Sequence, residues 1–409
     1  PQEVVANLQY QPTTGVDGRQ YIIDTYNLDP DPNQSGETLE GPIPLVIWDK
    51  EEGWRKITPK ILAGMRGVNI GVMFGGWALR DPDYMGKKYM SIPPREFNMI
   101  GPNDLLMQTG IENGIHDLRK GPERFDFTIP DYSFKFFKQH QQEGLTLQWS
   151  TIIAGNGNLH IPNWLKDIKD KGEYMNAITH HISTILTRYQ GNNITYVLVN
   201  EYFGNPFTND PSTMFWLLKN RSLGISDLEF MDFVFKAAKE ADPTSRLVFN
   251  EYGLEIPDSY NYVQSKENKI YSLLKQCKKN GVPIDDVGFQ MHLYGRDFRD
   301  ENRRALLLNN FRNQIRKYQS LGLQVNITEL DVRIDDMPDL PLAERLRLQA
   351  LVYYLITKTA IEEGITNINI WGVSDRDSWL NDPQLTGADS LETRPLLFDN
   401  NDDPKFAYY

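Results

Sequence analysis

Short apolar runs alternate with longer helical patterns from about residue 68 to the end of the chain. Their apolar character is continuous, with no strict alternation of polar and apolar residues. Continuous runs favour strands that are buried on both faces, as in parallel sheets. Eight such runs predict strands at residues 68–74, 96–100, 145–149, 194–201, 246–251, 286–292, 323–329 and 367–373.

Helical periodicity fills the gaps between these runs. Ser226 followed by Glu229 predicts a capping box at the start of one helix, and Gly364 is expected just past the end of another. The clearest helices are residues 130–142, 174–189, 227–240 and 342–363. Eight strands that alternate with helices predict an α/β protein, a (β/α)8 TIM barrel over residues 61–409. A doubly wound open sheet is the alternative, although the chain contains no GxGxxG or Walker A motif.

Residues 1–60 do not follow this alternation. Clusters of Gly, Pro, Asp and Asn, such as residues 27–40, separate short aromatic-rich runs. We expect an N-terminal extension packed on the barrel, with a small β element. A separate sugar-binding module is the alternative.

Composition limits the classes of partner. The chain has 409 residues with a net charge of −12, and an acidic surface argues against nucleic acid and anionic membranes. No apolar stretch approaches the roughly 20 residues of a membrane span. Cys277 is the single cysteine, so disulfides within the chain are excluded. We see no signal peptide, and a start at Pro1 without Met fits a processed or trimmed chain; we expect a secreted or extracellular protein.

Two glutamates end two of the predicted strands. Glu201 closes the fourth strand and Glu329 closes the seventh. Active sites of TIM barrels lie at the carboxyl ends of the strands, and hydrolysis of a glycoside with retention needs one carboxyl group as acid and one as nucleophile. We expect these two strands to lie side by side, with the carboxyl groups about 5–5.5 Å apart.

Five segments in this order resemble glycoside hydrolase family 10, the xylanase family. Residues 196–203 resemble its acid/base strand, 326–331 its nucleophile strand, and 289–293 its Gln-x-His strand. Residues 371–379 resemble the family's last strand and loop, and residues 394–399 resemble its closing segment.

The resemblance implies a retaining, endo-β-1,4-xylanase-like hydrolase of β-linked plant polysaccharides or oligosaccharides. Glu201 would be the acid/base and Glu329 the nucleophile. Asn200 would bind the sugar 2-hydroxyl and His292 would hydrogen-bond Glu329. The substrate-binding residues that we expect are Asn200, Gln290, His292, Trp149, Trp371, Trp379 and Asp104. The expected partner is a carbohydrate, with no cofactor and no metal.

The chain departs from the family on the side that binds the glycone sugars. Asn103, Asp104 and Met107 replace the family's Glu, Asn and Lys, and Ser150 replaces a histidine. Val197 replaces an Asp, which predicts the loss of one orienting partner of the central histidine. Each lost donor would cost a site for sugar hydroxyls about 1–3 kcal/mol.

These departures keep two alternatives open: a retaining hydrolase or transglycosylase for a different β-glycoside, and a catalytically weak carbohydrate-binding barrel. Metal-dependent hydrolysis is disfavoured, because the chain has only six His and no HExxH motif. We expect Glu251 to lie on the surface or to cap a helix. Loop residues that could rebuild the sugar site include polar Asn156, Asn158 and His160 and stacking candidates Tyr202, Phe207 and Trp216.

Overall fold

The computed structural model describes residues 58–104, 125–155, 161, 163–204, 215–255, 261–381 and 393–409, and four short strands before them. Those four strands form an antiparallel sheet in the order β1-β2-β3-β4. Their bounds are Thr13–Thr14, Gln20–Ile23, Val46–Asp49 and Gly53–Lys56. The sheet confirms the small β element that was predicted within residues 1–60, while its packing on the barrel stays a prediction.

Eight parallel strands close into a barrel. Each pairs with the next along the chain, and β14 pairs with β5 to complete the ring. The strands are β5 (Asn69–Val72), β6 (Met99–Ile100), β7 (Thr146–Trp149), β9 (Thr195–Asn200), β10 (Arg246–Glu251), β11 (Asp286–Phe289), β13 (Gln324–Arg333) and β14 (Asn367–Ile370). The closed ring confirms the predicted TIM barrel and excludes the open sheet.

Two further short strands extend the carboxyl end of the barrel. β8 (Ile153–Ala154) pairs with β9, and β12 (His292–Tyr294) pairs with β13. The run predicted at residues 286–292 is therefore interrupted. Met291 has a φ of 67°, a left-handed conformation that breaks the strand before His292.

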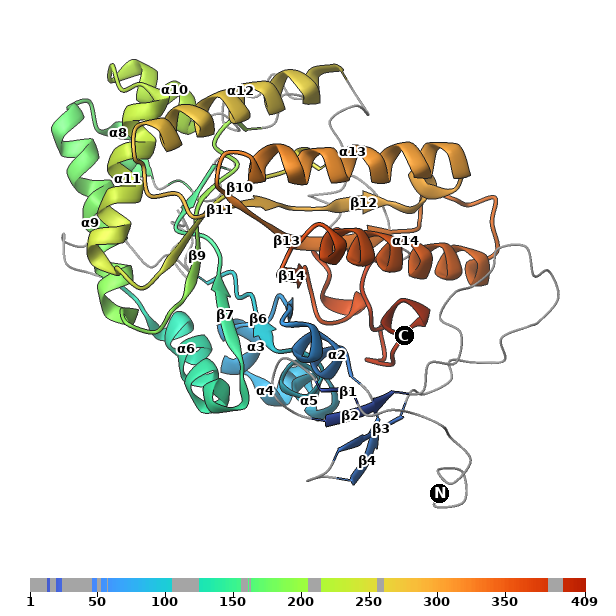
Figure 1. Ribbon diagram of the computed structural model, residues 1–409. Helices are drawn as coiled ribbons and strands as arrows, with labels where there is room; N and C mark the ends of the chain where they lie inside the picture. Colours follow the sequence, from blue (N-terminus) through green and yellow to red (C-terminus); the bar gives the residue numbers. More distant parts are fainter. Residues whose placement is uncertain are drawn as a thin grey trace, which may run out of the picture.

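Helices surround the barrel (Figure 1). Four match the predicted helices: α6 (Thr128–His140), α9 (Lys171–Tyr189), α11 (Asp227–Ala241) and α14 (Leu342–Glu362). Two further long helices were not singled out in the sequence, α12 (Asn261–Lys279) and α13 (Glu301–Gln319). The shorter ones are α2 (Pro59–Arg66), α3 (Gly76–Arg80), α4 (Pro82–Met85), α5 (Lys87–Glu96), α8 (Asn163–Asp167) and α10 (Phe215–Ser222), with single turns of 3-10 helix at Gln141–Glu143, Gly295–Phe298, Asp375–Asp377, Trp379–Asn381 and Phe406–Tyr408.

The helix ends follow local rules. The Ser226 side chain accepts the Glu229 amide at the start of α11, as half of the predicted capping box requires. Gly364 has a φ of 82° just past α14, the conformation expected of glycine there. These signals fix where the helices start and stop, and so the lengths of the loops at the barrel mouth.

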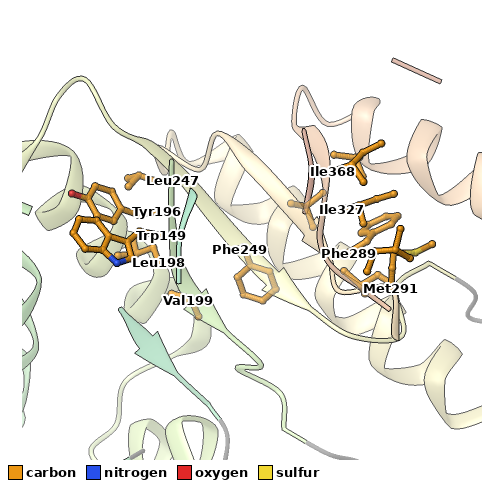
Figure 2. Close-up of a cluster of buried hydrophobic side chains, with 14 of the residues drawn as sticks. Trp149, Tyr196, Leu198, Val199, Leu247, Phe249, Phe289, Met291, Ile327 and Ile368 are labelled. Carbon is orange, nitrogen blue, oxygen red and sulfur yellow. The ribbon is translucent and has the colours of Figure 1, made fainter. Parts of the chain in front are cut away.

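Large side chains fill the interior of the barrel and the layer beneath the helices. Trp149, Tyr196, Leu198, Phe289 and Ile327 all belong to one buried cluster (Figure 2). Every residue of β11 is buried, and so are all residues of β10 after Arg246, which explains the continuous apolar runs. Burial of each such side chain stabilises the fold by about 1.5–3 kcal/mol.

Candidate active site

Glu201 follows β9 directly and lies at the carboxyl end of the barrel. Its side chain is partly exposed and its backbone φ is 53°, a left-handed value that is uncommon outside glycine. Its Oε1 atom accepts a hydrogen bond of 2.9 Å from Gln290 Nε2 and one of 3.3 Å from Asn200 Nδ2. Amide donors therefore hold one carboxylate oxygen of Glu201.

Glu329 lies inside β13 and is only 6% exposed. Its Oε1 atom accepts a hydrogen bond of 2.7 Å from Asn250 Nδ2, and its Oε2 atom lies 3.2 Å from His292 Nε2. Both oxygens of this buried carboxylate are thus held by the protein. The predicted bond between His292 and Glu329 is present.

His292 lies between two carboxylates. Its Nδ1 atom is 2.9 Å from Asp331 Oδ2, an oxygen that also accepts a 2.8 Å bond from Trp379 Nε1. When both carboxylates are ionised they can only accept hydrogen bonds, and both ring nitrogens of His292 then act as donors. Burial disfavours the charged ring, but Asp331 and Glu329 together raise the pKa of His292 well above its ordinary value.

Asp331 corrects one expectation from the sequence. We expected Val197 to leave His292 without one orienting partner, but Asp331 orients the ring from a position two residues after Glu329 on the same strand. Side chains two residues apart in a strand point to the same face, so one strand supplies both carboxylates that hold the ring. Trp379 completes this group with its ring 5.0 Å from that of His292, edge to face.

Asn250 links the two candidate catalytic carboxylates. Its Nδ2 atom donates at 2.7 Å to Glu329 Oε1 and at 2.7 Å to Asn200 Oδ1, and its Oδ1 atom accepts from the Thr328 hydroxyl at 2.6 Å. A Cβ atom at Gly288 would lie 2.2 Å from that same oxygen. Sequence reasoning placed Asn250 at a strand end but gave it no role; only the contact with Glu329 reveals one.

We expected the strands of the two glutamates to be neighbours in the barrel, but they are not. β10 and β11 lie between β9 and β13. The intervening strands supply Asn250 and Gln290, so the hydrogen bonds run from Glu201 through Asn200 and Asn250 to Glu329. The carboxyl separation of about 5–5.5 Å stays a prediction.

Burial dominates the electrostatics of Glu329. It raises the pKa of the carboxyl group, and the charge of nearby Glu201 adds to that rise. The hydrogen bonds from His292 and Asn250 act in the opposite direction. The net shift of the pKa is upward, so the donors offset the effect of burial only in part.

The other expected substrate-binding residues differ in exposure. Trp371 follows β14 and is partly exposed, like Trp379. Trp149 is fully buried and packs at 8° to the Tyr196 ring plane, with ring centroids 6.3 Å apart. Trp149 lies within the buried cluster (Figure 2). Its burial does not favour contact with a sugar, and that contact stays a prediction.

Asp104 follows β6 and is buried. Its carboxylate accepts the Gly76 amide at 3.3 Å and the Ser133 hydroxyl. Burial raises the pKa of Asp104 to about 6, against the opposing effect of these two donors. The carboxylate thus ties α3 and α6 to the strand end, and its predicted contact with substrate stays untested.

Three further sequence interpretations are wrong. Glu251 is not on the surface: it is fully buried and pairs with Lys266 at 2.7 Å. Tyr202 and Trp216, which were candidates for stacking on sugars, are also fully buried. The Tyr202 hydroxyl donates to Asp227 at 2.9 Å, and Trp216 Nε1 donates to the Ala154 carbonyl at 2.7 Å.

Several other candidates lie outside the described residues: Met107, Asn156, Asn158, His160 and Phe207. Across the part of the chain that the structure describes, no three His, Cys, Asp or Glu side chains are grouped as a metal site would require. No helix among those residues has both the length and the apolar character needed to cross a bilayer.

Known proteins share this architecture. The sequence profile of glycosyl hydrolase family 10 matches residues 64–409. Endo-1,4-beta-xylanase B of Thermotoga neapolitana is 28% identical over 87% of this chain and 91% of its own length. Endo-1,4-beta-xylanase A of Caldicellulosiruptor saccharolyticus is 32% identical over 70% of this chain and 85% of its own length.

A solved structure agrees with these sequence relatives. Xylanase 10B of Thermotoga petrophila, crystallised in complex with xylobiose, has a TM-score of 0.68 and 27% identity, and the match covers 87% of this chain and 96% of that one. The profile spans most of the chain, including both strands that carry the paired glutamates. The chain therefore belongs to glycosyl hydrolase family 10 and is an O-glycoside hydrolase.

Proposed function

We propose that the protein hydrolyses a β-1,4-linked xylan-type chain with retention of anomeric configuration, with Glu201 as acid/base and Glu329 as nucleophile. One observation carries the proposal: Glu201 and Glu329 lie at the two ends of a single hydrogen-bond network at the barrel mouth. A network of this kind fixes both carboxyl groups relative to each other, as double displacement requires.

In the first step a Glu329 oxygen attacks the anomeric carbon. The bond from that carbon to the leaving oxygen breaks, and Glu201 gives its proton to that oxygen. In the second step Glu201 takes a proton from a water molecule, and the water oxygen attacks the anomeric carbon. Glu329 then leaves as a carboxylate and the sugar has been inverted twice, so its configuration is retained.

The residues around Glu329 suit the charge changes of this cycle. His292 carries a positive charge against Glu329, and Asp331 holds the ring in place. This arrangement stabilises the carboxylate that leaves in the second step. Partly exposed Trp371 and Trp379 would contact the apolar face of the central sugar.

Two observations support xylan as the substrate class. The relatives above are endo-1,4-β-xylanases, and the solved structure holds xylobiose. The changed residues Asn103, Asp104 and Met107 on the glycone side favour a second candidate, a different β-glycoside with the same catalytic pair. The assignment of the substrate and the assignment of the mechanism can therefore be tested separately.

Proton NMR of the first sugar released from xylohexaose tests the mechanism. We expect the β-anomer to form first and the α-anomer to appear only by mutarotation. Early release of the α-anomer would overturn the retaining assignment. Turnover of β-glucosides or β-cellobiosides with none of β-xylosides would instead select the second candidate.

A further inference from the structure

The backbone at Glu201 needs support from its neighbours. A φ of 53° is unusual for a residue that bears a Cβ atom, and such conformations persist only where surrounding structure fixes them. The chain turns immediately after this residue: the Gly204 amide donates to the Glu201 carbonyl at 3.0 Å. The orientation of the Glu201 side chain therefore depends on how firmly residues 201–204, which we call the acid/base turn, are held.

One side of the acid/base turn packs against β8. The Gly155 amide donates to the Asn200 carbonyl at 2.6 Å. A Cβ atom at Gly155 would lie 2.0 Å from the Glu201 carbonyl oxygen, so only glycine allows this close approach. This side fixes where the turn begins.

Within the turn, the Tyr202 hydroxyl bonds Asp227 and Asn220. The next strand of the barrel adds a side-chain bond at the far end of the turn. Tyr252 follows β10, and its hydroxyl donates to the Gly204 carbonyl at 2.6 Å. Gly204 is the residue whose amide closes the turn on Glu201. The Tyr252 hydroxyl thus joins the end of β10 to the far end of the acid/base turn.

A buried ion pair fixes the Tyr252 ring. Lys266 Nζ lies 3.3 Å from the ring centroid and 2.7 Å from Glu251 Oε1. Lys266 is only 5% exposed and Glu251 is fully buried. A desolvated ammonium over an aromatic face is strongly attracted to it, and Glu251 Oε1 also accepts the Tyr252 amide at 3.2 Å. The ring therefore has little freedom to turn away from Gly204.

From this geometry we infer that Tyr252 is a positioning residue for the acid/base: its hydroxyl, set by the Lys266–Glu251 pair, holds the turn that aims Glu201. The inference rests on the proposed role of Glu201. The hydroxyl contacts the acid/base turn and not the Glu329 network, so its loss should impair proton transfer selectively. Glycoside cleavage depends on that proton when the leaving group is poor, and depends on it little when the leaving group is good.

The test compares wild type, Tyr252→Phe and Glu201→Ala on phenyl and 2,4-dinitrophenyl β-xylobioside. Loss of one hydrogen bond predicts a fall of about three- to tenfold in kcat/KM for the phenyl substrate. The dinitrophenyl substrate should keep its wild-type kcat/KM, while its kcat falls and is restored by sodium azide, which attacks the glycosyl-enzyme without needing a base.

Tyr353→Phe is the matched control. Its buried hydroxyl also donates to a backbone carbonyl, that of Pro395, at 2.7 Å, but it does not touch the acid/base turn. This variant should show equal ratios to wild type for both substrates and no effect of azide. Thermal unfolding of both variants measures how much stability each hydroxyl contributes.

Equal losses on both substrates for Tyr252→Phe, without azide rescue, would overturn the positioning role while Glu201→Ala still behaves as an acid/base variant. If Glu201→Ala itself shows no dependence on the leaving group, the proposed function fails first. Should Tyr252→Phe not fold, Glu251→Gln combined with Lys266→Gln removes the support of the ring, and the same selective loss is expected.

Discussion

The two carboxylates that we propose as catalytic are held in different ways. Glu329 lies within a regular strand, is almost fully buried, and has both oxygens bonded to side chains of other elements. Glu201 lies on a turn with a left-handed backbone and is partly exposed; within the part of the chain that the structure describes, its hydrogen-bond donors reach one oxygen, Oε1. The proposed nucleophile is fixed by side-chain interactions, and the proposed acid/base mainly by its backbone.

This difference matches the two tasks. A nucleophile must attack along one line and leave as an anion, which favours rigid placement beside the positive charge of His292. An acid/base must exchange protons with a leaving group and then with water, which favours exposure on one side. The predictions below test each half of the site, from the largest expected effect to the smallest.

Glu329→Ala removes the nucleophile and gives the largest loss. We expect kcat/KM to fall by about 10⁴-fold or more on both phenyl and 2,4-dinitrophenyl β-xylobioside, because no leaving group can replace the attacking oxygen. Steady-state kinetics measure the fall. Substantial activity on the dinitrophenyl substrate would show that another group attacks the sugar.

Glu201→Ala should distinguish the role of Glu201 from that of Glu329. Loss of acid catalysis predicts a fall of about 10²- to 10⁴-fold for the phenyl substrate and a much smaller one for the dinitrophenyl substrate. Added azide should raise turnover of the latter and yield a β-glycosyl azide, which chromatography detects. A uniform loss would remove the distinction between the two carboxylates.

Asn250→Ala cuts the link between them. A lost hydrogen bond to a charged group costs about 1.5–3 kcal/mol, so we expect kcat/KM to fall by roughly 10- to 100-fold. Asn98→Ala is the matched control, because the Asn98 amide is also buried and bonded through both its nitrogen and its oxygen, but to the backbone groups Val68 O and Ile70 N outside the site. Equal kinetics for the two variants would show that Asn250 acts only through the fold.

His292→Gln gives the smallest effect, on stability. The pKa of His292 is raised in the folded protein, so its stabilisation is complete below the unfolded pKa of about 6.5 and is lost as pH rises towards the folded value. Urea unfolding from pH 5.5 to 9 should show wild type losing its advantage over the variant by at most about 1.4 kcal/mol per pH unit. An advantage that grows with pH would contradict the charged ring.

The sequence was informative where local pattern decides structure. Continuous apolar runs predicted every barrel strand, and the predicted end of the fourth strand located Glu201 directly after β9. Glu329 was expected to close its strand, but β13 continues past it to Arg333. The resemblance to the family supplied their roles. These features depend on chain order and strand periodicity, which one sequence records.

Hydrogen-bond and ion-pair partners on different strands and helices could not be predicted from the sequence in the same way. Asp331 orients His292, and Asn250 bridges to Glu329 from a strand that lies between β9 and β13. Glu251 was expected on the surface or at a helix cap, whereas its buried pairing with Lys266 of α12 is visible only in the folded structure. Exposure likewise separates Trp379 from buried Trp149, although both were expected to contact sugar.

Covalent trapping is the most direct measurement of the central claim, that Glu329 attacks the sugar opposite Glu201. The protein is incubated with 2,4-dinitrophenyl 2-deoxy-2-fluoro-β-xylobioside and digested, and the labelled peptide is sequenced by mass spectrometry. The label should be found on Glu329 at one equivalent per chain. A label on another residue would contradict the account, and so would an enzyme that turns over the unfluorinated substrate without ever acquiring a label.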